Sequence, residues 1–189
     1  VVFVPIMFED SKEKVVSKCH EVAKHLEKTG VSVFVDDRDG YTPGWKFNEW
    51  ELKGVCLRVE IGAKDLEKNS AVIVRRDTKK KHEVKLSDVH VFVPKELEKM
   101  QADLLAKAEK WLADNSVHAK SWKDFVKAVD DKKMIHASWC CNDECAEKIK
   151  TETEGVKCLT LPFSAEKPFA KCVKCDKPAK HVGVFAKAY

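Results

Sequence analysis

The sequence has no hydrophobic run long enough to cross a membrane. Its longest apolar runs, such as Val1–Ile6 and Val31–Val35, have the length of strands, whereas a membrane-spanning helix needs about 20 apolar residues. The start also lacks the basic leader and the small-residue cleavage site of a signal peptide. We therefore expect a cytoplasmic protein without a membrane partner. Because the chain begins abruptly in a strand-like run, we expect it to be the C-terminal piece of something longer.

Motifs of catalysis are missing as well. Gly40 and Gly44 do not form a phosphate loop or a dinucleotide-binding pattern. The seven histidines are scattered, and no Ser/His/Asp or Cys/His arrangement for a nucleophile is present. The sequence therefore predicts no catalytic residue.

The sequence also lacks a strong excess of basic or of acidic residues. The chain has 35 basic and 31 acidic residues, and its net charge is +4. This balance permits a nucleic-acid partner but does not indicate one.

The apolar content of 44% over 189 residues can build one large core or two small ones. Val1–Ile6 and Val31–Val35 are typical of buried parallel strands, and the apolar residues between them recur at helical spacing, which predicts a βαβ unit. The patterns that follow predict helices near 45–53, 94–113, 121–129 and 143–153 and strands near 55–61, 71–76, 134–139, 156–163 and 181–185.

These elements predict an α/β protein with a mixed, mainly parallel sheet flanked by helices, followed by a small α/β domain. We expect a first domain at 1–95, a connecting helix and boundary at 96–120, and a second domain at 121–189. The connecting helix carries an apolar stripe from Leu97 to Leu112, which we expect to pack on its own domain. Residues 62–69 are expected as a turn, and Ser121 as a helix N-cap.

Six of the eight cysteines lie after residue 139. Cys140-x4-Cys145 and Cys172-x2-Cys175 are two short pairs separated by 26 residues, and this is the spacing of a tetrahedral four-cysteine zinc site. Four ligands leave no open position, so the predicted Zn²⁺ is structural.

Other interpretations of the cysteines remain open. Cys141 is an alternative ligand by adjacency, and His136 and His181 flank the cysteine pairs as second choices. A disulfide or redox pair, or free buried thiols, would need no metal. The remaining cysteines lie on apolar faces and are expected in the core: Cys19, Cys56 and Cys158.

The stretch Pro43–Asp65 combines aromatic rings with lysine, arginine and glutamate. Such surfaces suit unpaired bases, because rings stack on bases while cations and carboxylates bond to their edges. On a helix Phe47 and Glu51 share one face, and Arg58 points from the following strand. A solvated helix with ordinary ion pairs is the alternative, with Trp45 and Trp50 in the core.

Gly40–Asp65 closely resembles the anticodon-binding domain of prolyl-tRNA synthetases of the archaeal/eukaryotic type. Further parts of the chain continue the likeness, which spans essentially the whole sequence: Val74–Asp77, Trp139–Cys145, Lys171–Lys180 and Phe185–Tyr189. The resemblance implies that the first domain reads the anticodon of tRNA-Pro and that the second holds zinc.

The anticodon of tRNA-Pro ends in two guanines, whose N1–H and N2–H groups donate to a carboxylate and whose O6 and N7 accept from arginine or lysine. The resemblance implies base reading by Glu51, Arg58 and Lys64, with Phe47 as a stacking partner. By charge alone, further residues are candidate phosphate contacts: Arg38, Lys46 and Lys53.

The resemblance also implies an N-terminal catalytic domain outside this chain, which uses ATP and Mg²⁺ to charge tRNA with proline and forms most of a homodimer interface. The chain alone should then be inactive. Tyr189 matches a C-terminal tyrosine that reaches toward the catalytic domain, whereas Cys56 replaces a usual proline and Cys141 a common glycine. The alternative function is a stand-alone RNA-binding or scaffold module of the same fold.

Overall fold

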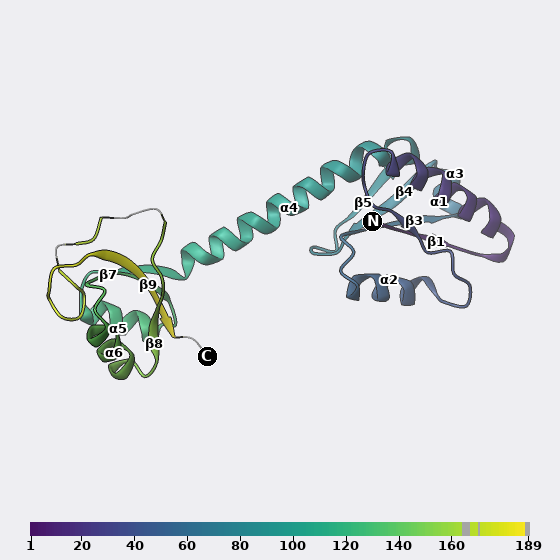
Figure 1. The fold of residues 1–189 in the computed structure, drawn as a ribbon. Coiled ribbons are helices and arrows are strands. Elements are labelled where there is room, and N and C mark those ends of the chain that lie inside the picture. The colour runs from purple at the N-terminus through teal and green to yellow at the C-terminus, as the bar shows by residue number, and fades with distance from the viewer. Residues whose placement is uncertain (164–166, 170, 188–189) are drawn as a thin grey trace. The chain divides into compact units, whose positions relative to one another are not determined.

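The computed structural model describes residues 1–163, 167–169 and 171–187 (Figure 1). The chain divides into two compact units, Val1–Leu104 (unit 1) and Leu105–Tyr189 (unit 2), and the division falls within the helix α4 (Val89–Asp114). Each unit has its own mixed sheet and its own core. The predicted mixed α/β fold is therefore confirmed. Across the described residues, no helix has both the length and the apolar character needed to cross a membrane.

Unit 1 is built on a five-stranded sheet in the order β2-β1-β3-β4-β5. Strand β1 is parallel to β2 and β3, whereas β4 is antiparallel to β3 and β5. The sheet is thus half parallel and half antiparallel. The elements before α4 are β1 (Val2–Ile6), η1 (Glu9–Ser11), α1 (Lys12–Glu27), β2 (Phe34–Val35), α2 (Pro43–Leu52), β3 (Leu57–Gly62), α3 (Ala63–Glu67), β4 (Ser70–Arg75), β5 (Lys81–Lys85) and η2 (Leu86–Asp88).

Helices α1 and α2 lie on opposite faces of this sheet (Figure 1). The chain moves from β1 outward to β2 and then back across β1 to β3, and right-handed crossovers in opposite directions place their helices on opposite faces. The core on the α1 face contains Leu57, Val59 and Ile61 of β3. Because side chains alternate along a strand, Arg58 and Glu60 lie on the face toward α2.

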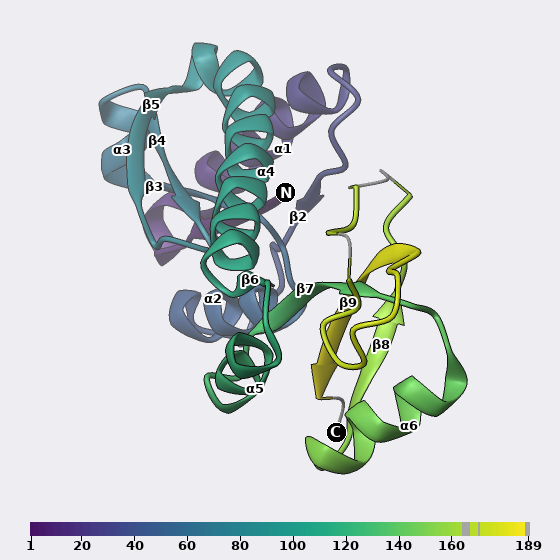
Figure 2. The same ribbon diagram turned by 90° about the vertical axis from the view of Figure 1, so that its left-hand side faces the viewer.

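Unit 2 has a four-stranded sheet in the order β6-β7-β9-β8. Strands β6 and β7 are parallel, and β9 is antiparallel to both of its neighbours. Both crossover helices run in the same direction across the sheet, so α5 and α6 share one face (Figures 1 and 2). The elements are β6 (Ser116–Ala119), α5 (Trp122–Asp130), β7 (Met134–Trp139), α6 (Asp143–Glu152), β8 (Val156–Thr160) and β9 (His181–Lys187).

Several local predictions need correction. Strand β2 has two residues rather than five, and its Phe34 is exposed. The expected turn at 62–69 contains the helix α3, and α4 begins at Val89, five residues before the helix expected from residue 94. Val89 and Val93 are four residues apart and both buried in unit 1, so packing overrides the strand preference of valine.

The apolar stripe of α4 is only partly packed. As expected, Leu97 packs against the core of unit 1 and Met100 is buried. Leu104, Trp111 and Leu112 are 42%, 67% and 47% exposed, so the prediction that the whole stripe packs on its own domain is wrong. The N-cap prediction is confirmed, because Ser121 Oγ accepts a hydrogen bond of 3.1 Å from the backbone N–H of Asp124.

Candidate nucleic-acid interface and metal site

Helix α2 has clear start and stop signals. Thr42 is the N-cap, and its Oγ1 accepts a hydrogen bond of 3.3 Å from the backbone N–H of Trp45. Pro43 occupies the first helical position, where a missing N–H costs nothing. Gly54, with φ of +81°, ends the segment in a conformation that favours glycine. These signals fix which residues of α2 face β3.

Three predicted site residues come together at this face. Nη1 of Arg58 donates to Oε1 of Glu51 at 3.1 Å, and Nε of Arg58 donates to Oε1 of Glu60 at 2.9 Å. The guanidinium carbon of Arg58 lies 3.9 Å from the ring centroid of Phe47, a cation–π distance. Phe47, Glu51 and Arg58 therefore form one cluster, and Glu60 joins them.

Lys64 does not join this cluster. It lies in α3, which follows the end of β3, and its side chain is exposed. Gly62, the last residue of β3, is four residues beyond Arg58, a span of about 13 Å along the strand. The structure thus places Lys64 at the opposite end of the strand from Arg58.

Glu51 opens onto a hollow of about 420 Å³, lined by Asn48, Glu51, Leu52, Arg76 and Lys79. The side chain of Glu51 is 28% exposed, whereas that of Arg58 is 12% exposed. Lys79 Nζ bonds to Oε2 of Glu51. Lys79, together with Arg58, lowers the pKa of Glu51 below its ordinary value, so the carboxylate is ionised at neutral pH.

Sequence reasoning missed Arg76 and Lys79 as neighbours of this site. Both lie between β4 and β5, in a turn rich in basic residues. The antiparallel pairing of β3 with β4 sets Arg58 opposite Val74, and the backbone N–H of Arg76 donates to Cys56 O at 3.0 Å. This pairing, which the sequence pattern did not reveal, brings the turn to the end of α2.

A buried ionic network fixes α2 to the sheet. The carboxylate of Asp36 is fully buried. Arg38 Nε and Nη2 each donate to it at 2.8 Å, and Trp50 Nε1 donates at 2.7 Å. Lys46, only 1% exposed, donates from Nζ to the backbone O of Asp36 at 3.0 Å. Lys46 is therefore unavailable as a phosphate contact, and that prediction is wrong.

Two other predicted core residues are at the surface. Trp45 is 45% exposed, in contrast to the buried position expected for it. Cys56 is exposed just before β3, whereas Cys19 is buried as predicted. Cys158 is half-buried. Periodicity alone placed all of these side chains on apolar faces, because it does not show where an element ends.

The stability of unit 1 should depend on the ionisation of Asp36. Bonds from Arg38, and then from Trp50, hold the pKa of Asp36 at about 2, below the value of about 3.9 in unfolded chains. Because the pKa of Asp36 is lower in the folded state, its ionised form stabilises the folded state above pH ~4 by about 2 kcal/mol. This stabilisation is lost as the pH falls toward 2. Urea unfolding at pH 5 and at pH 2 measures the free energy of unfolding of the wild type and of Asp36→Asn. The difference between the two proteins should be smaller at pH 2 by this amount. A constant advantage would contradict the pKa assignment.

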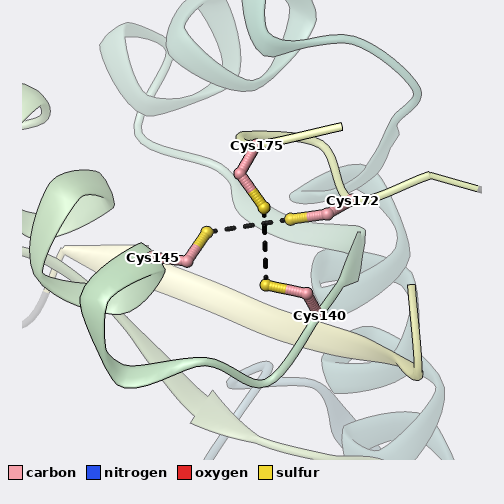
Figure 3. A group of neighbouring side chains, drawn as sticks. All are labelled: Cys140, Cys145, Cys172 and Cys175. Atoms are coloured by element: carbon pink, nitrogen blue, oxygen red, sulfur yellow. Dashed lines mark hydrogen bonds between the residues drawn. The ribbon is translucent and has the colours of Figure 1, made fainter. Parts of the chain in front are cut away.

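In unit 2 the four predicted ligand cysteines converge (Figure 3). The sulfurs of Cys140 and Cys175 are 3.6 Å apart, those of Cys145 and Cys172 are 3.8 Å apart, and all four lie within 4.8 Å of one another. A disulfide requires about 2.05 Å, and all of these cysteines are free. Three are buried and Cys175 is half-buried. This group could hold a metal ion.

Two backbone turns place these sulfurs. Cys140 follows β7, and Asn142 Oδ1 caps α6 by accepting from the backbone N–H of Cys145 at 3.4 Å. The other turn is docked on β7, because the backbone N–H of Val173 donates to Ser138 O at 2.8 Å. The same turn is closed by the N–H of Cys172, which donates to Lys177 O at 2.8 Å. The cluster therefore connects β7, α6 and a loop 27 residues further along.

The alternative ligands lie outside the group. Cys141 has φ of +54°, a left-handed conformation that favours glycine, and its sulfur is not among the four that converge. Within the described ranges, neither His136 nor His181 belongs to a metal-binding group. The geometry therefore selects Cys140 over Cys141.

The environment of the cluster shifts the pKa values of its thiols in different directions. Burial raises the pKa of Cys140 and of Cys145. Burial also acts to raise the pKa of Cys172, but backbone N–H groups, those of Lys174 and Cys175 foremost, lower it to about 7. One thiol is thus ready to ionise near neutral pH, and metal binding requires thiolates.

Comparison with known proteins finds a matching family model for part of each unit. Residues 1–96 match the family model described as "Anticodon binding domain", and residues 122–189 match "Prolyl-tRNA synthetase, C-terminal". "Proline--tRNA ligase 2" of Clostridioides difficile is 43% identical over 190 residues, which cover all of this chain and 39% of that relative. A putative proline--tRNA ligase of Saccharomyces cerevisiae is 35% identical, covering 96% of this chain and 29% of the relative.

A solved structure has the same fold. The crystal structure of prolyl-tRNA synthetase from Cryptosporidium parvum, complexed with L-proline and AMP, matches with a TM-score of 0.87 and 38% identity. The match covers all of this chain and 40% of that one. The chain thus spans about two fifths, or less, of the length of these relatives. Residues 122–189 are similar to the C-terminal domain of prolyl-tRNA synthetases. The chain belongs to the family of anticodon-binding domains.

Proposed function

We propose that this chain is the C-terminal part of a cytoplasmic prolyl-tRNA synthetase and that unit 1 recognises the anticodon of tRNA-Pro. The whole protein would be a homodimer that joins proline to its tRNA, with ATP and Mg²⁺ held by a catalytic domain outside this chain. The family matches and the named relatives support this proposal. The observation that carries it is an ionised Glu51, oriented by Arg58, at an open hollow with basic neighbours.

The site has the chemistry to read a guanine. A carboxylate such as that of Glu51 accepts from guanine N1–H and N2–H, and its 28% exposure lets a base edge reach it. Arg76 and Lys79 line the same hollow and can donate to O6 and N7 or to a phosphate. Arg58 is largely covered and bonded to two carboxylates, so we assign it mainly to orienting Glu51. The ring of Phe47 supports Arg58.

Glu51→Gln tests this assignment. Glutamine keeps the shape of glutamate but loses the charge and places an N–H group where an acceptor is needed. We expect the discrimination between a tRNA-Pro transcript and one with both anticodon guanines replaced by adenine to fall ~5- to 150-fold, the equivalent of 1–3 kcal/mol. Filter binding at fixed salt measures both dissociation constants. Unchanged discrimination would overturn the proposed role of Glu51.

Lys64→Ala is the matched comparison. Because Lys64 lies in α3, beyond the end of β3 that is opposite Arg58, we expect this variant to bind both transcripts slightly and equally less well, as for a phosphate contact. If Lys64→Ala instead reduces the discrimination between the two transcripts as much as Glu51→Gln does, Lys64 also reads a base. A wild-type chain that binds both transcripts equally would favour a general RNA-binding module.

We further propose that the four cysteines bind one structural Zn²⁺. Zn–S bonds of 2.3 Å in a tetrahedron place neighbouring sulfurs about 3.8 Å apart, and the two measured separations are 3.6 and 3.8 Å. Four cysteine ligands leave no open position for a substrate or water. The ion would cross-link the two turns and hold the loop before β9 against β7.

We propose a division into a first domain, a connection and a second domain, for which the sequence predicted the bounds 1–95, 96–120 and 121–189. The two family matches end at residue 96 and begin at residue 122, which supports it. Strand β6 pairs with β7 inside unit 2, so we assign Ser116–Ala119 to the second domain and shorten the connection accordingly.

A further inference from the structure

We propose that Tyr41, Trp45 and Arg38 form a second base-stacking site, at the N-terminal end of α2. It would bind an unpaired nucleotide that flanks the two guanines read at Glu51, whatever its base. This inference rests on the proposed function and extends it to a site where the protein contacts RNA without reading sequence.

The two rings form an exposed stacked pair. The ring centroids of Tyr41 and Trp45 are 4.2 Å apart with an interplanar angle of 24°, and both residues are 45% exposed. The guanidinium carbon of Arg38 lies 5.1 Å from the first centroid and 5.5 Å from the second. Rings and guanidinium planes at a surface are the groups on which unpaired bases stack.

The site is held in place by the buried network behind it. Arg38 bonds to both carboxylate oxygens of Asp36 and also to Glu49. The backbone of Trp45 is bonded to the N-cap hydroxyl of Thr42. A stacking surface that is ordered before binding loses little side-chain entropy when a base arrives.

The stacked pair is continuous with the hollow at Glu51. Trp45, Asn48 and Leu52 are exposed along one side of α2, and Asn48 and Leu52 line the hollow. Leu52 is seven residues after Trp45 in the helix, a rise of ~10 Å, which is about three stacked base steps of 3.4 Å. One single-stranded loop can therefore occupy both places.

The local charges allow a phosphate backbone to approach. The first turn of α2 has no acidic residue of its own, so the positive end of the helix dipole is not offset from within the helix. Of the nearby acids, Asp37 is paired with His20 at 3.0 Å and Asp39 with Lys12 at 2.6 Å. Lys12 partly compensates the negative charge of Asp39, and Arg38 partly compensates those of Asp36 and Glu49.

Trp45→Ala tests the proposal in the same filter-binding assay. Loss of one stacked base should weaken the binding of both transcripts by ~5- to 150-fold, by the same factor, so that discrimination stays as in the wild type. Tyr41→Ala should act in the same direction, and Trp45→Phe, which keeps a ring, should recover most of the affinity. Circular dichroism checks that each variant is folded. Trp111→Ala, an exposed tryptophan of unit 2, is the control and should bind as the wild type does.

Folded Trp45→Ala and Tyr41→Ala variants with unchanged affinity would overturn the stacking site and leave the role of Glu51 intact. A Trp45→Ala variant that loses discrimination would also overturn it, because the site would then read a base. If Glu51→Gln has no effect while Trp45→Ala weakens binding, the stacking site stands and the anticodon-reading proposal fails.

Discussion

Replacing Cys145 with serine should remove the metal from unit 2 and unfold it, while unit 1 stays folded. A serine oxygen is a poor ligand where thiolates hold the ion, and the other three sulfurs would lose their common partner. Structural zinc sites contribute apparent binding free energies of about 10–16 kcal/mol, as large as the 5–15 kcal/mol that stabilises a whole domain. Metal analysis should fall from one zinc per chain to none. Amide hydrogen exchange should become fast in β7 and α6 and stay slow in β1 and β3.

Cys141→Ser is the matched control for this prediction. Cys141 is adjacent to Cys140 but its sulfur lies outside the group of four, so this variant should keep its zinc and its exchange protection. A chelator applied to the wild type should reproduce the effect of Cys145→Ser on unit 2 alone. If Cys141→Ser loses the metal and Cys145→Ser keeps it, the ligand assignment is wrong. If the freshly purified wild type contains no metal, the zinc proposal falls.

The cysteine group shows what sequence spacing predicts well. Two short pairs at turns have few ways to present four sulfurs, so their convergence was predictable although the turns are 27 residues apart. The choice between Cys140 and Cys141 was less secure from spacing alone. It depends on backbone direction after β7, where Cys141 adopts a positive φ and its sulfur stays out of the group.

The nucleic-acid interface was predicted less completely. Helical spacing placed Phe47 and Glu51 on one face, and strand alternation added Arg58 from β3. The strand expected at 55–61 already placed Lys64 beyond its end, as the structure does. Spacing could not show that Lys79 bonds to Glu51. That contact depends on the register of β3 with β4, a pairing between segments that short-range patterns do not specify.

The sequence also did not reveal the buried ion pairs of unit 1. Lys46 looked like a surface cation, because lysine is almost never fully buried unless it is paired. Its partner Asp36 comes from the end of β2, ten residues earlier, and only the assembled fold brings the two together. The same holds for Arg75 at the end of β4, because two of its three carboxylate partners are on α4, more than 20 residues further along the chain.

Arg75→Ala should destabilise unit 1 by about 3–5 kcal/mol, the usual cost of leaving a buried charge without its partner. The side chain of Arg75 is 3% exposed, and it donates to Asp77 at 2.7 Å, to Glu96 at 3.0 Å and to Asp103 at 2.8 Å. Glu96 is itself buried. Without Arg75 the carboxylate of Glu96 would keep only a 3.8 Å contact with His82 and would have to be hydrated or protonated. Strand β4 would also lose its ion pairs with α4. Urea unfolding should show the loss, and hydrogen exchange should speed up in α4 from Val89 to Asp103.

A second change separates the buried charge from the lost packing. Adding Glu96→Gln to Arg75→Ala removes the unpaired carboxylate, so the double variant should be more stable than Arg75→Ala alone. Arg76→Ala is the control, because the neighbouring arginine is exposed and surface substitutions change stability by about 0.5 kcal/mol or less. If Glu96→Gln gives no recovery, the cost of Arg75→Ala comes from packing and from Asp77 or Asp103. If Arg76→Ala destabilises equally, the buried network does not hold α4 to the sheet.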